Sequence, residues 1–182
     1  MSLNLSALEK KILVCALPLI IIVLSGSTFA QTNSVQELKK NVQIIKDKSI
    51  SIQPSDPWTI DHIITAEELS NELKNSGEKK PLIYYVGFDF LYKQSHIPGS
   101  VYTGPANKQQ GLDKIKSELK NVKLDQYIVI YCGCCPWTDC PNIRQAYNTC
   151  KKLGFTNVKV LYIPNSFAAD WKNKGYPIER KN

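Results

Sequence analysis

Three short apolar runs separated by helical patterns constrain the fold of this chain more than any other feature of its sequence. The runs are "LIYYVGF" (82–88), "YIVIY" (127–131) and "VKVLYI" (158–163). Helical patterns lie between them, at 112–119 and 142–153. Continuous apolar runs, rather than alternating ones, are typical of parallel strands that are covered on both faces. The sequence therefore predicts an α/β fold with a central, mainly parallel sheet flanked by helices.

Capping and breaking residues mark further boundaries. Thr65, followed three residues later by Glu68, is a capping box that predicts a helix over residues 66–75. Upstream, residues 36–48 place apolar side chains among lysines at helical spacing, which predicts an amphipathic helix. The two prolines of "SISIQPSDPW" (49–58) then indicate a linker onto the domain.

The first thirty residues have the pattern of a secretory signal peptide. Lys10 and Lys11 precede the apolar run 12–24, which gives way to the small residues of "SGSTFA". The run is shorter than the about 20 residues of a membrane-spanning helix, so cleavage after Ala30 would leave no stable membrane span. We therefore expect an exported protein, and the lysine- and asparagine-rich composition indicates a bacterial periplasm, where disulfides are permitted. The expected parts are a signal peptide (1–30), an N-terminal helix and linker (31–58) and one folded domain (59–180).

The charge of the chain bears on its partners. The formal net charge is +7, but the lysines are scattered along the sequence, and the only arginines are Arg144 and Arg180. Nucleic-acid binding usually shows basic residues grouped on one face. The sequence thus predicts no nucleic-acid partner, and the excess charge favours solubility and a mild attraction for small anions.

Four of the six cysteines lie in "CGCCPWTDC" (132–140). Cys132 is the first residue after the run 127–131, and Pro141 is suited to open the next helix, since its missing N–H costs nothing there. Ligands of parallel α/β sheets bind beyond the carboxyl ends of the strands. Loop amides and the positive end of the helix dipole are expected to stabilise a Cys132 thiolate, which makes Cys132 the candidate nucleophile.

With this loop in view, the chain resembles the rhodanese family of sulfurtransferases. The resemblance spans residues 63–177, with "HIPGS" (96–100), "IVIYC" (128–132), "KKLGFTNVKVL" (151–161) and "W…GYP" (171–177) in the family's order. It implies a rhodanese-like three-layer fold and a persulfide mechanism at Cys132. The cysteine would take a sulfane sulfur from a small sulfur-containing anion such as thiosulfate and pass it to an acceptor such as a protein thiol. The resemblance implies no cofactor.

The chain departs from the family pattern around this loop, which is longer than usual. Tyr85-Val86-Gly87 stands where ordinary members have an Asp-Val-Arg-type stretch, and Trp137 stands where a common member has an arginine. Loss of that guanidinium removes a partner for an oxyanion, which puts thiosulfate as the donor in question; Arg144 or Lys93 is the candidate substitute. The expected substrate loop comprises Gly133, Pro136, Trp137, Thr138 and Arg144.

The other loop cysteines admit three explanations. As resolving or redox thiols, Cys134, Cys135 and Cys140 would relieve a Cys132 persulfide or protect Cys132 through a reversible bridge. As a metal site, the four thiols would hold a soft ion, Cu(I) ahead of zinc, although adjacent Cys134 and Cys135 cannot easily both point inward. As structural bridges, they would staple a non-catalytic domain. We favour the redox or persulfide role, with a copper-binding or disulfide-stapled binding module as the alternative.

Structural roles are expected for several other side chains. His96 is expected to anchor its loop by hydrogen bonding, and Trp137 to roof the cysteine loop rather than stack on a substrate. Asp139 is expected to cap the following helix or to interact with its dipole. The tyrosines of the predicted strands are expected in the core: Tyr84, Tyr85, Tyr127 and Tyr131.

Overall fold

A computed structural model describes residues 35–40, 50–75 and 80–181, and the chain divides into two units between residues 47 and 48. In the first unit, residues 35–40 are helical and exposed. They agree with the start of the predicted amphipathic helix, whose remaining residues lie outside the described ones. The predicted signal peptide and its cleavage site also lie outside them. Over the described ranges, no helix combines the length and apolar character that crossing a membrane requires.

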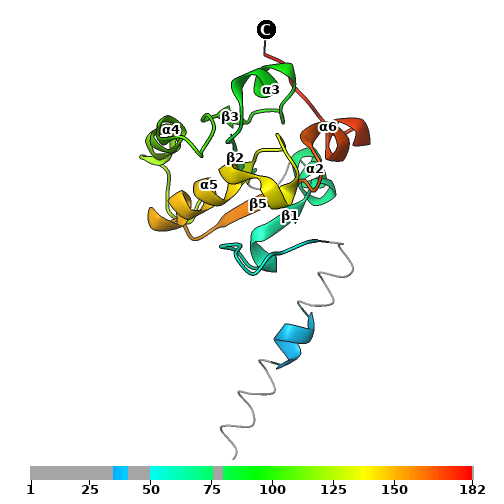
Figure 1. Ribbon diagram of the computed structural model, residues 1–182, viewed down its shortest axis with the longest axis vertical. Helices are drawn as coiled ribbons and strands as arrows, with labels where there is room; N and C mark the ends of the chain where they lie inside the picture. Colours follow the sequence, from blue (N-terminus) through cyan, green and yellow to red (C-terminus); the bar gives the residue numbers. More distant parts are fainter. Residues whose placement is uncertain (1–34, 41–49, 76–79, 182) are drawn as a thin grey trace, which may run out of the picture. The chain divides into compact units, whose positions relative to one another are not determined.

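A five-stranded parallel sheet forms the centre of the second unit (Figure 1). The strands follow the spatial order β1-β5-β4-β2-β3, and every neighbouring pair is parallel, so β4 is the middle strand. All residues of β4 are buried, which explains why its sequence is an uninterrupted apolar run. The bounds are β1 (Ile63–Thr65), β2 (Leu82–Tyr85), β3 (Val101–Tyr102), β4 (Ile128–Tyr131) and β5 (Val158–Tyr162).

Helices cover both faces of this sheet. On one face, α5 packs against β4, β5 and α4. On the other, Leu69 of α2, Tyr92 of α3 and Phe167 of α6 share a core with alternate strand residues such as Tyr85 and Tyr131. Figure 1 shows α4 and α5 on one side of the strands and α2 and α6 on the other. The predicted three-layer α/β fold is confirmed. The helix bounds are α2 (Ala66–Lys74), α3 (Asp89–Gln94), α4 (Gln109–Leu119), α5 (Pro141–Lys152) and α6 (Phe167–Asp170), with short 3-10 helices at Ile60–His62, Trp137–Asp139 and Lys172–Lys174.

The long elements follow their sequence signals, and the short ones do not. The three apolar runs form β2, β4 and β5, and the capping box begins α2, since Glu68 N donates to Thr65 Oγ1 at 3.2 Å and Thr65 N to Glu68 Oε2 at 2.9 Å. The edge strands β1 and β3 were not predicted. They have 3 and 2 residues, too few to show a periodic pattern.

Residues 50–58, predicted as a linker, lie against the folded domain. Trp58 is buried, and Ser51 bonds in two directions. Its N–H donates to the Tyr162 hydroxyl at 3.0 Å, and its carbonyl accepts from Trp137 Nε1 at 3.0 Å. These contacts tie the segment both to β5 and to the cysteine loop.

Candidate active site

The cysteine loop leaves the sheet at the carboxyl end of β4, and α5 begins at Pro141 as predicted. Because β4 lies between two strands and under helices on both faces, the first residue of the loop is still inside the domain. Cys132 is therefore only 3% exposed. Cys140 is also buried, whereas Cys134 and Cys135 are half-buried.

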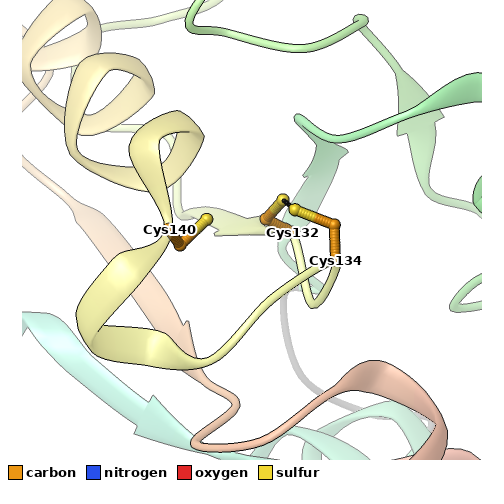
Figure 2. Close-up of side chains that lie close together, drawn as sticks. All are labelled: Cys132, Cys134 and Cys140. Atoms are coloured by element: carbon orange, nitrogen blue, oxygen red, sulfur yellow. Dashed lines mark hydrogen bonds between the residues drawn. The ribbon is translucent and has the colours of Figure 1, made fainter.

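Three sulfur atoms of the loop lie together. The Sγ atoms of Cys132, Cys134 and Cys140 are all within 4.8 Å of one another, and Figure 2 shows those of Cys132 and Cys134 facing each other while Cys140 points toward them from the other side. Cys132 Sγ donates a hydrogen bond to Cys134 Sγ at 3.2 Å. All five described cysteines are free thiols, so this structure is that of the reduced loop. The cluster places two of the predicted resolving thiols beside the predicted nucleophile.

Cys135 lies next to this group without being part of it. Its Sγ lies 3.2 Å from that of Cys134, and its side chain lines a small space together with Cys132, Cys140 and Trp137. The fourth thiol of the loop is therefore also close to the other three.

Gly133 makes the close packing of the loop possible. Its φ is +75°, a value that side chains rarely adopt, and its carbonyl accepts a hydrogen bond from Phe167 N at 3.0 Å. A Cβ at this position would lie 2.8 Å from Phe167 Cβ and 2.9 Å from Phe167 N. The loop backbone therefore lies directly against the start of α6.

Asn142, a residue that the sequence analysis did not single out, connects two of the sulfurs. It is fully buried in the first turn of α5, and its Oδ1 accepts from Asn107 N at 3.0 Å. That bond turns its Nδ2 toward Cys132 Sγ at 3.5 Å and Cys134 Sγ at 3.7 Å. In the sequence, the signal that could have identified Asn142 was its position as a polar residue directly after Pro141.

The helix amides do not hold the sulfur for which they were predicted. The N–H groups of Asn142 and Ile143, at the start of α5, act to lower the pKa of Cys140 and do not affect that of Cys132. The reason is that Cys140 is the N-cap residue, so its side chain lies over the first turn. Cys140, not Asp139, is the N-cap residue, so the capping role expected of Asp139 is wrong, whereas its interaction with the helix dipole stays a prediction.

Hydrogen bonds within the cluster favour Cys134 over Cys132 as the site of the negative charge. Bonds from Cys132 and Cys140 lower the pKa of Cys134 against the opposing effect of burial. The bonds with Cys134 and Cys140, together with burial, raise the pKa of Cys132 well above its usual value. The pKa of Cys140 and that of Cys135 are raised as well. These directions favour a thiolate at Cys134 rather than at Cys132, which agrees with the S–H of Cys132 donating to Cys134.

Arg144 faces away from the sulfurs. Its Nε donates to Asp56 Oδ1 at 2.8 Å, and its Nη1 donates to the carbonyls of Trp137 and Cys140 at 3.2 Å each. The guanidinium thus ties the loop to the upstream segment 50–58. The other predicted substitute, Lys93, pairs with Asp89 at 2.6 Å.

The remaining residues of the predicted substrate loop lie on its outer side. Trp137 is buried against Trp58 and Tyr162, with ring centroids 5.2 and 4.9 Å away, which agrees with its expected role as a roof. Pro136 and Thr138 are exposed.

His96 anchors its segment as expected. The side chain is buried, with Nδ1 2.8 Å from the Tyr92 carbonyl. Its backbone exchanges hydrogen bonds with Glu179 at 2.9 and 2.8 Å.

A pocket of about 150 Å³ opens beside Cys134. Because Cys132 and Cys140 are buried behind it, Cys134 is the member of the three-sulfur cluster that meets this pocket. None of the described residues that line the pocket is charged apart from the Cys134 thiolate. They are Tyr85, Leu91, Gln94, Ser95, Gly133, Cys134, Ser166, Phe167 and Ala168.

Comparison with protein families gives one match to this chain: the model of the rhodanese-like domain matches residues 34–163. No curated protein gives a significant match. The match includes β1 to β5 and the whole cysteine loop.

Solved structures share the fold. The BH2092 protein from Bacillus halodurans is 24% identical, with 65% of this chain and 77% of that chain covered and a TM-score of 0.51. A full-length protein from Lactobacillus plantarum is 14% identical, with 78% and 98% covered and a TM-score of 0.52. The Alr3790 protein from Anabaena sp. is 24% identical, with 64% and 82% covered and a TM-score of 0.49. The first two of these structures share the fold of this chain, and at these identities the likeness extends to the fold alone.

Replacing Gly133 by alanine is expected to destabilise the domain by about 1–3 kcal/mol, because the new Cβ would clash with the start of α6 at an already strained φ. Gly99→Ala is the matched control, since Gly99 has a φ of +71° but nothing within 4 Å of the added Cβ. Denaturant unfolding of both variants measures the difference. Equal losses would show that only the backbone angle matters and that the contact with Phe167 is soft.

Cys134 is expected to react with iodoacetamide well below the pH at which ordinary thiols do. Its lowered pKa means that the thiolate persists as the pH falls, so the alkylation rate should change little between about pH 8 and pH 6. A free cysteine of pKa about 8.5 loses roughly 80-fold over that interval. Stopped-time mass spectrometry measures the rates. A steep, ordinary profile in the wild type, or a flat one that survives Cys134→Ser, would contradict this assignment.

Proposed function

The chain belongs to the family of rhodanese-like domains, and on that premise we propose that it is a sulfurtransferase that carries sulfane sulfur on the Cys132–Cys134 pair. The observation that supports this most is the arrangement of the loop thiols. One half-buried sulfur lies at a pocket, and a buried sulfur lies 3.2 Å behind it at the end of the middle strand.

Cys134 receives the sulfur in this proposal. Its thiolate attacks the sulfane sulfur of a donor, an S–S bond forms at Cys134, and the donor's own S–S bond breaks with its electron pair leaving on the remainder of the donor. No oxidant is needed, because one S–S bond replaces another. Support comes from exposure, since Cys132 is too buried to meet a donor directly.

Cys132 then takes the sulfur from Cys134. The Cys132 sulfur attacks the terminal sulfur of the Cys134 persulfide, the new S–S bond forms at Cys132, and Cys134 leaves as the thiolate that accepts the proton of Cys132. The exchange is neutral in electrons, and the short distance between the two Sγ atoms supports it. The product is the Cys132 persulfide that the family resemblance implies, shielded from water until an acceptor thiol removes its outer sulfur.

The pocket favours a polysulfide or a thiol persulfide over thiosulfate as the donor. Among the described residues that line it, none is a lysine or arginine, and the guanidinium of Arg144 is held by Asp56. A doubly charged oxyanion would enter without a partner for its charge.

A protein thiol is the favoured acceptor. Phe88 and Phe90 are exposed, Phe90 by 66%, and their rings stack at 6.1 Å. Leu91, next in the chain, lines the pocket. Exposed aromatic pairs beside a reactive group are typical of contacts with polypeptides. The proposal also keeps export to a bacterial periplasm, which rests on the N-terminal sequence alone.

Reduced protein treated with polysulfide and then desalted is expected to gain about 32 Da, the mass of one sulfur, in an intact mass spectrum. Cys132→Ser should lose the stable adduct. Cys134→Ser should acquire it at least about tenfold more slowly, because a buried thiol with a raised pKa must then meet the donor itself. Cys150→Ala is the control, since Cys150 is buried in α5 outside the cluster, and it should load like the wild type. An adduct that persists in Cys132→Ser, or wild-type loading in Cys134→Ser, refutes the relay.

A second candidate function is the binding of Cu(I), and the three-sulfur cluster favours it. A metal bound at about 2.3 Å from three sulfurs in a plane needs them about 4 Å apart, and the three Sγ atoms here all lie within 4.8 Å of one another. Structural zinc sites are almost always four-coordinate, whereas within the described residues this group offers three thiols. The chemistry of the ligands therefore suits soft Cu(I) better than zinc.

Anaerobic titration of the reduced protein with Cu(I) against a chromogenic Cu(I) chelator tests this candidate. Stoichiometric binding weakened more than about tenfold in Cys140→Ser is expected, because one of three ligands is lost. Cys135→Ser is the matched control and should bind normally, because Cys135 lies outside the group. Binding that depends on Cys135 as much as on Cys140 would contradict the assigned ligand set.

A further inference from the structure

The hydroxyl of Tyr85 has no hydrogen-bond partner among the described residues. Tyr85 is the last residue of β2, its side chain is 2% exposed, and its Oη is fully enclosed. Most buried hydroxyls in native proteins are paired, because an unpaired one loses its bonds to water without replacement. This unpaired group therefore requires an explanation.

The unpaired hydroxyl faces the same small space as the buried sulfur of the site. A Cβ placed on Gly87 would lie 2.6 Å from Tyr85 Oη and 2.9 Å from Cys132 Sγ. The hydroxyl and the sulfur therefore lie close together on either side of the point where a Gly87 side chain would begin, and they leave no room for one. Tyr85 also lines the pocket beside Cys134. Two members of the departing stretch 85–87 thereby act together: Tyr85 supplies a donor, and Gly87 has no side chain that would separate this donor from the sulfur.

The ring of Tyr85 is held so that the hydroxyl cannot turn elsewhere. It packs against Tyr131 and Tyr92 with ring centroids 5.0 and 5.4 Å away. The Tyr85 carbonyl accepts from both N and Oγ1 of Thr103 at 3.0 and 3.1 Å, which fixes the backbone. Neighbouring Tyr131 differs, since its hydroxyl accepts from Ile97 N at 3.0 Å and lies 3.1 Å from Ser100 Oγ.

We propose that the Tyr85 hydroxyl is the hydrogen-bond donor that holds the sulfane sulfur on Cys132. The inference rests on the proposed function, because it supplies that persulfide with a partner. An extra sulfur atom on Cys132 lies about 2 Å beyond Sγ, on the side of the pocket that Tyr85 and Cys134 line, and the Tyr85 O–H donates to its negative charge. No proton is transferred. A donor fixed in a dry site stabilises a charge more than a mobile one does, since no reorganisation is required.

The surroundings keep the hydroxyl a donor. Burial first, and then the negative charge of the nearby thiols, raises the pKa of Tyr85, so the phenol stays protonated at any working pH. Tyr85 thus takes the place of the arginine that the loop lacks, with a neutral donor suited to a singly charged sulfur rather than to an oxyanion. The titratable groups that affect the Tyr85 site are Cys132, Cys134, Tyr131 and Tyr102.

Tyr85→Phe tests the inference, because it removes only the oxygen atom. With polysulfide as the probe, the variant should still gain one sulfur, but the concentration for half-maximal loading should rise about tenfold, the loss expected for one hydrogen bond to a charged group. Its melting temperature should be unchanged or higher, because an unpaired buried hydroxyl is removed. A purely structural role would instead lower it.

Tyr131→Phe is the matched control. It also removes a buried hydroxyl from a strand end, but one that is paired, so its melting temperature should fall while half-maximal loading stays at the wild-type concentration. Wild-type loading of Tyr85→Phe overturns this inference alone. Absence of loading in the wild type overturns the proposed function, so the two failures are distinguishable.

Discussion

The burial of β4 governs everything that the cysteine loop can do. As the middle strand of a parallel sheet with helices on both faces, it carries Cys132 into the interior before the chain can turn toward solvent. The thiol at the position that the family uses for chemistry is therefore enclosed. Beside it lies Cys134, which borders a pocket and whose sulfur accepts the Cys132 hydrogen bond at 3.2 Å. This S–H···S contact joins the enclosed sulfur to the more exposed one.

The departures from the family pattern compensate for one another in space. The enlarged loop brings Trp137 under the segment 50–58, and Arg144 secures that contact by pairing with Asp56. Because the guanidinium of Arg144 is held in this ion pair, it does not reach the pocket beside Cys134. No lysine or arginine is among the described residues that line that pocket. Gly87 and Tyr85, which replace a charged pair of the usual pattern, place an unpaired hydroxyl close to Cys132 with no side chain between them. This largely apolar surrounding supports the proposal that the site takes a sulfur species of low charge.

Prediction from sequence succeeded where a signal was local or periodic. The runs that form β2, β4 and β5, the capping box of Thr65 and Glu68, and the proline at the start of α5 depend on residues close in the chain. The cysteine loop could be located from them, because the end of a buried strand follows from its apolar pattern. The edge strands β1 and β3 and the short helices α3 and α6 were not predicted, because their stability comes from strand pairing and packing rather than from their own residues.

By itself, the sequence determined the parallel α/β architecture, the strand end at which the thiols gather and the family to which that arrangement points, because hydrophobic periodicity and motif order are properties of a linear chain. Only the tertiary structure decided which sulfur is exposed, which one carries the charge, and that Asn142, Tyr85 and Gly87 belong to the site. Those properties depend on distances between atoms brought together from β2, the loop and α5. Burial and hydrogen bonding across such elements set the ionisation of a thiol, and no spacing along the chain encodes them.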